Sequence, residues 1–480
     1  MTDTKRILSV INPRTGKPDY EIEAASPETV ALEAARLRTA QPEWRARGMD
    51  GRGDALRRLA DALERHSETV SAALEIDTGR RRLARAEVQG VIGSMRGWTM
   101  LAPTLIEDPA WVQGRAKPNF KHQTELVPYQ LLGVISPWNF PITLSFIDAI
   151  PALMAGACVL IKPSEVTPRF ADALGPVIAE TGLSDIIAFV QGDGATGAEI
   201  MPNVDCVCFT GSVATGRKVA LAAAQNLIPA NLELGGKDPM IVTASADMDA
   251  ASTLALRASA LATGQACQSI ERVYVPASDY ERFILQLTEK AKHISFNYPD
   301  ISFGDIGPFI FYKQASIVLD QIEDAKAKGA TVMCGGVVER HGGGYWMAPT
   351  VIRDVTHDMD IMQEETFGPV IPVMAYKTIE EAIALANDTE FGLSGAVYAG
   401  SIEEAHAVAQ HIDAGAISLM DGALTGQYFE APKQSFKASG LGGSRMGTEG
   451  FRRFFRQKAY IANTGCPLTM SDFSEAGNTP

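Results

Sequence analysis

The chain has 480 residues, of which 46% are hydrophobic and 21% charged, an ordinary globular composition. Its length suggests about two or three domains. The formal net charge of −14 gives no general attraction for nucleic acid or anionic lipid, so neither is expected as a partner, although a local basic patch is not excluded.

No targeting or membrane segment is predicted. Residues 1–16 alternate charged and apolar side chains and lack the continuous apolar core of a signal peptide. The most apolar stretch, residues 131–161, is interrupted by prolines, Asn139 and Asp148, which argues against a spanning helix. The six cysteines form neither a Cys-x-x-Cys pair nor a Cys/His cluster with zinc spacing. We therefore expect a cytoplasmic protein from a reduced compartment, without a metal site.

The first part of the chain predicts a helical layer. Between Pro27 and Gly97, apolar residues recur at spacings of three and four, as at Leu56, Leu59 and Leu63. Beyond Leu131, short apolar runs alternate with turns and amphipathic segments, which is typical of a parallel sheet with crossover helices. The runs are 131–136, 158–161, 186–190 and 204–209, and the amphipathic segments are 168–181 and 213–226.

A second alternating α/β region follows Gly236. The two glycines at 235 and 236 give the backbone freedom for a hinge, so we place a domain boundary there. The tail beyond Ala459 is polar and rich in glycine and proline from Gly465, so it either pairs with a neighbouring subunit or is disordered. The expected strands of this region are 240–242 and 273–275, and the expected helices are 248–262, 280–291 and 314–328.

Cys267 follows a helical segment and stands close to Gly264, with Arg272 five residues further on. A nucleophilic cysteine needs access and surroundings that favour the thiolate, and a tight turn can supply both. A small buried hydrophobic residue would look the same. The segment alone therefore does not decide between a nucleophile and an inert thiol.

Glu233 and Asn139 are two further candidates for chemistry. Glu233 lies between two leucines in a strand-like run, where a carboxylate is either salt-bridged or kept available as a general base. Asn139 lies between Pro137 and Pro141, and its fixed amide could donate to a developing oxyanion. It could equally be the N-cap of the helix that begins at Pro141.

Two glycine loops could hold a phosphate. Residues 192–197 match Gly-x-Gly-x-x-Gly literally, and Gly211-Ser212 leads from a strand into a helix whose N-terminal amides could meet a pyrophosphate. Lys162 and Glu165 follow another strand and offer a cation and a carboxylate for ribose hydroxyls. Each of these segments could also be a plain strand-to-helix turn.

The order of these motifs resembles the aldehyde dehydrogenase superfamily over residues 12–460. The resemblance implies an α/β fold with a Rossmann-like cofactor domain at 1–108 and 129–236, and a second α/β catalytic domain at 237–440. It also implies an oligomerisation hairpin at 109–128 and 458–480, in a homodimer or homotetramer. The matching strings are Pro-Trp-Asn-Phe-Pro (137–141), Lys-Pro-Ser-Glu (162–165), Phe-Thr-Gly-Ser (209–212), Leu-Glu-Leu-Gly-Gly-Lys (232–237), Gly-Gln-Ala-Cys (264–267) and Glu-Thr-Phe-Gly-Pro (365–369).

By this resemblance, Cys267 attacks the aldehyde carbon while Asn139 and the Cys267 backbone N–H hold the oxyanion. Hydride passes to NAD, with NADP also possible, and Glu233 activates the water that hydrolyses the thioester. A carboxylate at Glu165 predicts a preference for NAD. The Gly192 motif becomes a tight turn near the adenine. The implied cofactor-binding residues are Ile135, Trp138, Lys162, Ser164, Glu165, Gly194, Phe209, Gly211, Ser212, Leu234, Glu365 and Phe367.

The resemblance places Phe140, Leu144, Ile147 and Gln268 at the substrate pocket. Relatives that oxidise succinate semialdehyde carry an arginine where this chain has Ile147, and relatives for betaine aldehyde carry an aromatic residue. We therefore expect an uncharged apolar or aromatic aldehyde. Alternatively, Leu144 and Ile147 are core residues and the divergent loop near Tyr428 lines the tunnel.

Several positions depart from the family pattern. Residues 432–437 replace the usual Pro-Phe-Gly-Gly-x-Lys, and 442–445 replace Gly-Arg-Glu, where the family closes its substrate mouth. Ala262 and Ser418 stand where asparagine is frequent. Two other functions stay open, a coenzyme A-acylating dehydrogenase and a non-catalytic member of the family. The glutamate at 233 argues against the first, and the intact Cys267, Glu233 and Asn139 set argues against the second.

Overall fold

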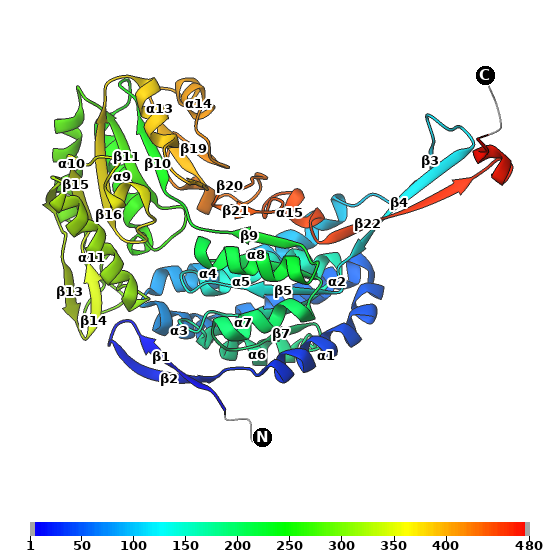
Figure 1. Ribbon diagram of the computed structural model, residues 1–480. Coiled ribbons are helices and arrows are strands. Elements are labelled where there is room, and N and C mark those ends of the chain that lie inside the picture. The colour runs from blue at the N-terminus through cyan, green and yellow to red at the C-terminus, as the bar shows by residue number, and fades with distance from the viewer. Residues whose placement is uncertain (1–4, 476–480) are drawn as a thin grey trace.

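The computed structural model describes residues 5–475, so the outermost residues of the expected cofactor domain and oligomerisation segment lie outside the described part. The chain begins with the hairpin β1 (Ile7–Asn12) and β2 (Lys17–Glu23). Four helices then form the predicted helical layer beside the first sheet (Figure 1). They are α1 (Pro27–Ala46), α2 (Gly48–Arg65), α3 (Ser67–Thr78) and α4 (Arg81–Leu101).

The first sheet has the strand order β21-β9-β8-β5-β6-β7, and β5 to β9 run parallel. The chain moves outward from β5 through β6 to β7, and then returns to build β8 and β9 on the other side of β5. This reversal creates the switch point at which open parallel sheets bind ligands. The strands are β5 (Leu131–Ile135), β6 (Cys158–Lys162), β7 (Ile187–Phe189), β8 (Cys206–Thr210) and β9 (Ala230–Glu233), and the helices are α5 (Pro141–Ala155), α6 (Arg169–Glu180), α7 (Gly194–Ile200) and α8 (Val213–Gln225).

The second sheet has the order β12-β15-β16-β11-β10-β18-β19, in which all strands but β12 run parallel. It forms a separate α/β layer beyond α8 and β9 (Figure 1). The strands are β10 (Asp238–Val242), β11 (Ile270–Pro276), β12 (Thr331–Cys334), β15 (Thr350–Arg353), β16 (Val370–Tyr376), β18 (Gly395–Tyr398) and β19 (Ile417–Leu419). The helices are α9 (Met248–Ala260), α10 (Tyr280–Lys292), α11 (Tyr312–Ala327), α12 (Asp360–Gln363), α13 (Ile379–Asn387) and α14 (Ile402–Ala409), and β13 (Val338–His341) with β14 (Gly344–Met347) forms a hairpin.

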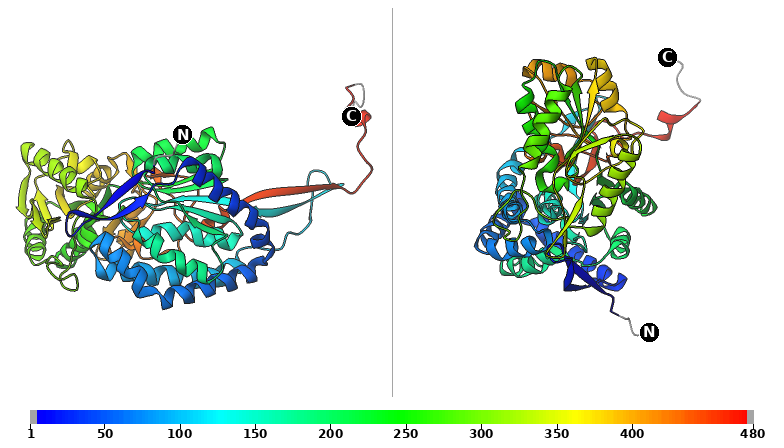
Figure 2. Two further views of the ribbon diagram at one scale, coloured as in Figure 1. Left: turned by 90° about the horizontal axis from the view of Figure 1, so that it is seen from below. Right: turned by 90° about the vertical axis from the view of Figure 1, so that its left-hand side faces the viewer.

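A third sheet projects from the body of the molecule as a long ribbon (Figure 2). It joins β22 (Phe455–Asn463) to β4 (Phe120–Pro128) and the short β3 (Val112–Gln113), all antiparallel. Its strands lie within the segments 109–128 and 458–480 that the sequence assigns to oligomerisation, except that β22 begins three residues before 458. Within residues 5–475, no helix is both long and apolar enough to cross a membrane.

The chain between 436 and 452 returns from the second sheet to the first. β20 (Phe436–Lys437) pairs with β17 (Phe391–Gly392) beside the second sheet, and β21 (Gly440–Leu441) pairs with β9 of the first sheet. The short helix α15 (Glu449–Arg452) then leads into β22. The end of the proposed catalytic domain therefore contributes an edge strand to the proposed cofactor domain, and this pairing brings the divergent loop to Glu233.

Candidate active site

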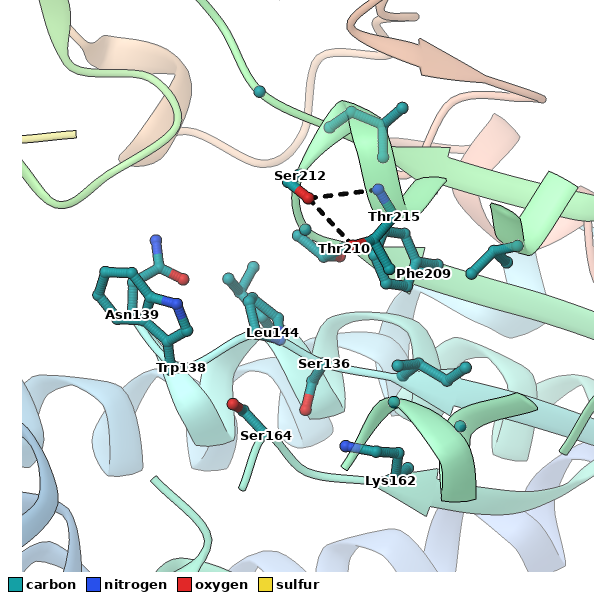
Figure 3. A pocket seen from close by; sticks show the side chains of 18 of the residues that line it. Ser136, Trp138, Asn139, Leu144, Lys162, Ser164, Phe209, Thr210, Ser212 and Thr215 are labelled. Carbon is teal, nitrogen blue, oxygen red and sulfur yellow. Dashed lines mark hydrogen bonds between the residues drawn. The ribbon is translucent and has the colours of Figure 1, made fainter. Parts of the chain in front are cut away.

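A cavity of about 640 Å³ lies at the carboxyl ends of β5, β6, β8 and β9. All twelve residues that the resemblance assigns to the cofactor line this cavity, and so do Asn139, Leu144 and Cys267. Figure 3 shows Asn139 and Trp138 on one side, Lys162 and Ser164 below, and Ser212 across from them. Strands far apart in sequence thus bring the predicted motifs to one place. Sequence reasoning missed other lining residues, among them Thr215, Lys218, Phe311 and Gln314.

A strained turn presents Cys267 to the cavity. Sequence reasoning extended the preceding helix to Ala262, but α9 ends at Ala260 because Ala262, Thr263 and Gly264 all have positive φ, from 58° to 67°. Non-glycine residues adopt this conformation only when tertiary contacts stabilise it. At Gly264 a Cβ atom would lie 2.1 Å from the carbonyl oxygen of Gly368, so only glycine fits.

Buried hydrogen bonds fix this turn. The Thr263 hydroxyl donates to the Gly307 carbonyl at 2.9 Å, and the Gln265 side chain accepts from the backbone N–H of Ile310 at 2.8 Å. The same Gln265 side chain donates to the Pro308 carbonyl at 3.2 Å. These bonds connect the nucleophile's turn to the segment before α11. The position of the thiol is therefore set by distant parts of the second domain.

The Cys267 thiol is half-buried and protonated at neutral pH. Burial raises its pKa to about 12, and the Lys433 ammonium opposes this shift, whereas the carboxyl groups of Glu365, Asp238 and Glu233 add to it. The other strand cysteines, Cys158, Cys206 and Cys208, are fully buried, as the sequence predicts for inert thiols. Cys267 therefore needs a proton acceptor before it can attack a carbonyl carbon.

Asn139 points its amide at the turn that carries Cys267. Its Nδ2 atom donates to the Gln265 carbonyl at 3.1 Å, which leaves a second N–H of the same amide for another acceptor. The N-cap position of α5 is taken by Phe140 and has no side-chain cap, so the alternative of Asn139 as a helix cap is wrong. Cys267 also has a free backbone N–H among the described residues. The two donors could share one oxyanion.

Glu233 ends β9 and is half-buried. Its carboxylate accepts a hydrogen bond from the Ser435 hydroxyl at 2.8 Å, and Gly440 of β21 pairs with it along the backbone. Glu233 is not among the residues that line the cavity, but its charge contributes to the raised pKa of Cys267. The carboxylate and the thiol are therefore near enough to influence each other.

A buried ion cluster lies next to Glu233. Arg445 donates to both oxygens of Asp148, at 3.2 and 2.9 Å, and Arg453 binds the same carboxylate. Arg445 also donates to the Thr210 hydroxyl, and the charge of Glu233 acts on it. The two arginines hold the pKa of Asp148 below its usual range against the opposing effect of burial. The divergent loop thus places a fixed cation beside the candidate base.

Sequence reasoning did not assign three neighbours of the reaction centre, which are Ser435, Arg445 and Lys433. All three lie in the loop that departs from the family pattern. The sequence does show that this loop is unusual, because polar or charged side chains stand in it where the family has phenylalanine, glycine and Gly-Arg-Glu. Only the folded chain shows that they face Glu233 and Cys267.

The Gly211–Ser212 turn has the form of an anion site. Ser212 is the N-cap of α8 and accepts from the Thr215 N–H at 3.3 Å (Figure 3). A Cβ at Gly211 would lie 2.6 Å from the Phe209 ring. In the second glycine motif, Gly192 has φ 148° and makes a tight turn, while Gly194 lines the cavity. The amides at the start of α8 are therefore open to a phosphate.

At the adenine side, as the resemblance would place it, Lys162 is almost fully buried. Its ammonium donates to the Pro163 carbonyl at 2.8 Å and lies 3.5 Å from the Glu165 carboxylate. Burial lowers the pKa of Lys162. At the opposite side, Glu365 accepts from the Gly236 N–H at 3.1 Å, and burial raises the pKa of this carboxyl group.

The substrate residues that the resemblance implies do not all reach the cavity. Leu144 lines it, whereas Phe140, Ile147 and Gln268 do not. The Phe140 ring packs under the Arg80 guanidinium, 4.9 Å from its centroid. Gln268 faces the 424–426 segment, since a Cβ at Gly426 would lie 3.1 Å from its Oε1 atom. The apolar wall expected from the sequence is thus reduced to Leu144 in this cavity.

Two mainly parallel sheets flanked by helices, with a cavity that joins a glycine-rich turn to a cysteine, define the class of protein as an α/β oxidoreductase. Residues 1–460 match the family model described as the aldehyde dehydrogenase family. The chain belongs to the aldehyde dehydrogenase family, which confirms the resemblance and the fold class drawn from the sequence.

Named proteins of this family resemble the chain along almost all of its length. A Mycolicibacterium smegmatis protein named "Putative succinate-semialdehyde dehydrogenase", with NADP(+) as stated cofactor, is 37% identical over 95% of this chain and 90% of its own. A solved structure from Anabaena variabilis, named "Putative Aldehyde Dehydrogenase PutA", is 48% identical, with a TM-score of 0.94 over 97% and 99% of the two chains. Betaine aldehyde dehydrogenase of Staphylococcus aureus, solved with NAD+, is 28% identical, with a TM-score of 0.91 over 97% and 93%.

Proposed function

We propose that this protein oxidises an aldehyde to the carboxylic acid, with NAD or NADP as the hydride acceptor and Cys267 as the nucleophile. The observation that carries the proposal is the meeting of the Cys267 thiol and the Asn139 amide at one cavity with all twelve predicted cofactor residues. The named relatives agree, because both cofactors occur among them and every one is an aldehyde dehydrogenase.

The residues present fit a dinucleotide. The amides at the start of α8 with Ser212 would hold the pyrophosphate, and Lys162 with Glu165 would hold the adenine ribose. Gly211 and Gly194 keep the approach to these groups free of side chains. Glu365 and Phe367 would bind the ribose at the nicotinamide end. When bound, NAD(P) accepts the hydride that leaves the aldehyde carbon.

The chain's own residues supply the remaining chemistry. Cys267 loses its proton to solvent, and its thiolate attacks the carbonyl carbon to form the oxyanion of a thiohemiacetal. The second N–H of the Asn139 amide and the Cys267 backbone N–H donate to its oxyanion. After hydride loss, Glu233 takes a proton from water and the resulting hydroxide attacks the thioester. The acid is released, and Glu233 returns the proton to the Cys267 thiolate that leaves. Ser435 orients the Glu233 carboxylate through its hydrogen bond at 2.8 Å.

Turnover of an aldehyde panel with NAD and with NADP tests this proposal, with and without coenzyme A. Free acid formed without coenzyme A supports hydrolysis by a Glu233-activated water. Dependence on coenzyme A would favour the acylating alternative, in which the thioester passes to a thiol. No reduction of either cofactor by any aldehyde would leave the non-catalytic alternative.

The substrate is the finer question. The sequence expectation of an uncharged apolar or aromatic aldehyde depends on Phe140, Leu144 and Ile147, of which only Leu144 lines the cavity. The relatives' names point in opposite directions, since succinate semialdehyde carries a negative charge and betaine aldehyde a positive one. The charge on the substrate has to be inferred from the residues of this chain.

A further inference from the structure

Lys433 lies in the divergent loop and is only 9% exposed. Its backbone N–H donates to the Ser444 hydroxyl at 2.9 Å, which joins the two halves of the loop. The next residue is packed too closely to shift, because a Cβ at Gly415 would lie 1.6 Å from the Gln434 carbonyl oxygen. The lysine therefore stands on a fixed piece of backbone.

The ammonium group of Lys433 makes no hydrogen bond and no ion pair within residues 5–475. Two other lysines are more deeply buried, Lys162 at 3% and Lys237 at 1% exposed, and both have partners. Lys162 donates to a carbonyl and lies near Glu165, and Lys237 contacts Glu271 at 2.8 Å and Thr366 at 2.9 Å. The Lys433 ammonium differs from these two because it has no partner within residues 5–475, so it is free to bind an anion that enters from outside.

The charge of Lys433 reaches the reaction centre. It lowers the pKa of the Cys267 thiol against burial, and it acts in the same direction on the Asp238 carboxyl. Cys267 and Asp238 flank the same spot, since a Cβ at Gly236 would lie 2.7 Å from the Cys267 carbonyl oxygen and from Asp238 Oδ1. The Lys433 ammonium is therefore close enough for its charge to act on the Cys267 thiol, although Lys433 is not among the residues that line the cavity.

The neighbouring carboxyl groups do not neutralise Lys433. Asp238 is buried, its oxygens contact the N–H and hydroxyl of Ser394, and burial raises its pKa to about 8. Glu233 is engaged with Ser435, and Glu365 with the backbone of Gly236. No carboxylate within residues 5–475 forms an ion pair with Lys433, so the cation is available to a group that enters with the substrate.

We infer that Lys433 binds an anionic group of the substrate, and that the enzyme acts on short aldehydes that bear a carboxylate. The inference rests on the proposed function. A charge-assisted hydrogen bond from the Lys433 ammonium would hold the carboxylate while the aldehyde carbon meets Cys267. Ile147 cannot supply a cation for the substrate carboxylate, and Lys433 of the divergent loop would supply it instead. A quaternary ammonium substrate would meet repulsion at the same place.

The test compares two aldehydes of equal chain length, succinate semialdehyde and butanal, which differ by the carboxylate. We expect kcat/KM of the wild-type enzyme to favour succinate semialdehyde by at least about tenfold. Lys433→Met should reduce that ratio by about tenfold or more, and Lys433→Arg should keep part of it. Lys437→Met is the control, because Lys437 lies in the same loop but pairs with Asp413 at the surface.

The ratio of kcat/KM for the two aldehydes distinguishes binding of the substrate carboxylate by Lys433 from activation of the Cys267 thiol. If Lys433 only promotes the Cys267 thiolate, Lys433→Met slows both aldehydes equally, and the unchanged ratio overturns the inference. Succinate should also slow alkylation of Cys267 in the wild type and not in Lys433→Met. Should Lys433→Met not fold, the wild type decides, because a preference for butanal or betaine aldehyde contradicts the inference. Turnover of butanal alone would leave the proposed function standing, whereas no turnover of any aldehyde would end both.

Discussion

A thiol with a pKa near 12 cannot be a resting thiolate, and this distinguishes Cys267 from cysteines that a neighbouring cation keeps ionised. Its reactivity depends on a proton acceptor and on the field of Lys433. The carboxyl groups of Glu365, Asp238 and Glu233 raise the pKa of Cys267 further and so oppose formation of the thiolate. Because the shift raises the pKa, the thiolate fraction stays small below the pKa and grows as the pH rises.

We therefore expect inactivation by iodoacetamide to accelerate about tenfold per pH unit between about pH 7 and pH 9, without a plateau. The rate of activity loss measures this, with peptide mass spectrometry to identify the modified residue. Cys466→Ser serves as the background, because Cys466 is the exposed thiol. A plateau near pH 8 would show that the free enzyme holds the thiol ionised.

Cys267→Ala should lose turnover and still bind the cofactor.

Glu233→Gln should slow thioester hydrolysis more than hydride transfer. The amide keeps the size and the Ser435 contact but cannot take a proton from water. We expect one rapid equivalent of reduced cofactor, followed by a steady state lowered by about a hundredfold or more. Stopped-flow absorbance separates the two phases. A steady-state rate equal to the wild type would exclude Glu233 as the base.

At the scale of elements, the end of β6 bears on the choice of cofactor. Glu165 is close to Lys162 there, and its carboxylate would accept from a ribose 2′-hydroxyl and repel a 2′-phosphate. We expect the wild type to prefer NAD, and Glu165→Gln to raise NADP use relative to NAD by about tenfold. The ratio of kcat/KM for the two cofactors measures this. Glu199→Gln on α7 is the matched control, and a wild type that favours NADP would contradict the prediction.

Local pattern accounts for the regular elements. The apolar runs predicted β5, β6 and β8, and the amphipathic segment 168–181 predicted α6 to within one residue at each end. Pattern could not show that α9 stops at Ala260, because the positive φ values at Ala262 and Thr263 depend on bonds to Gly307 and Pro308. Local pattern also could not show the hydrogen bond of Glu233, because its partner Ser435 is 202 residues away along the chain.

At the scale of the whole molecule, the ribbon of β4 and β22 projects away from the other elements of residues 5–475 (Figure 2). β22 is an edge strand, and Ile461 on it is 73% exposed. A long exposed edge with apolar side chains favours pairing with a second copy. The ribbon is thus the surface through which we expect a homodimer or homotetramer.

Ile461→Asp should therefore shift the protein toward smaller species, because a carboxylate would be buried without a partner at that contact. Light scattering coupled to size-exclusion chromatography measures the mass. Leu285→Asp is the control, since Leu285 is an exposed apolar residue of α10, away from the ribbon. A wild-type monomer would contradict the expectation, and so would equal effects of the two variants.

The pairing of β21 with β9 couples substrate selectivity to turnover, two properties that enzyme engineers usually wish to vary separately. The loop that carries Lys433 also carries Ser435, which contacts Glu233, and its continuation forms the strand beside that glutamate. A loop transplanted from a relative would exchange the group that meets the substrate and the group that orients the base in one step. We expect such chimeras to release product at a changed rate even when they accept the new aldehyde. Selectivity and turnover in this enzyme would then evolve together rather than as separable modules.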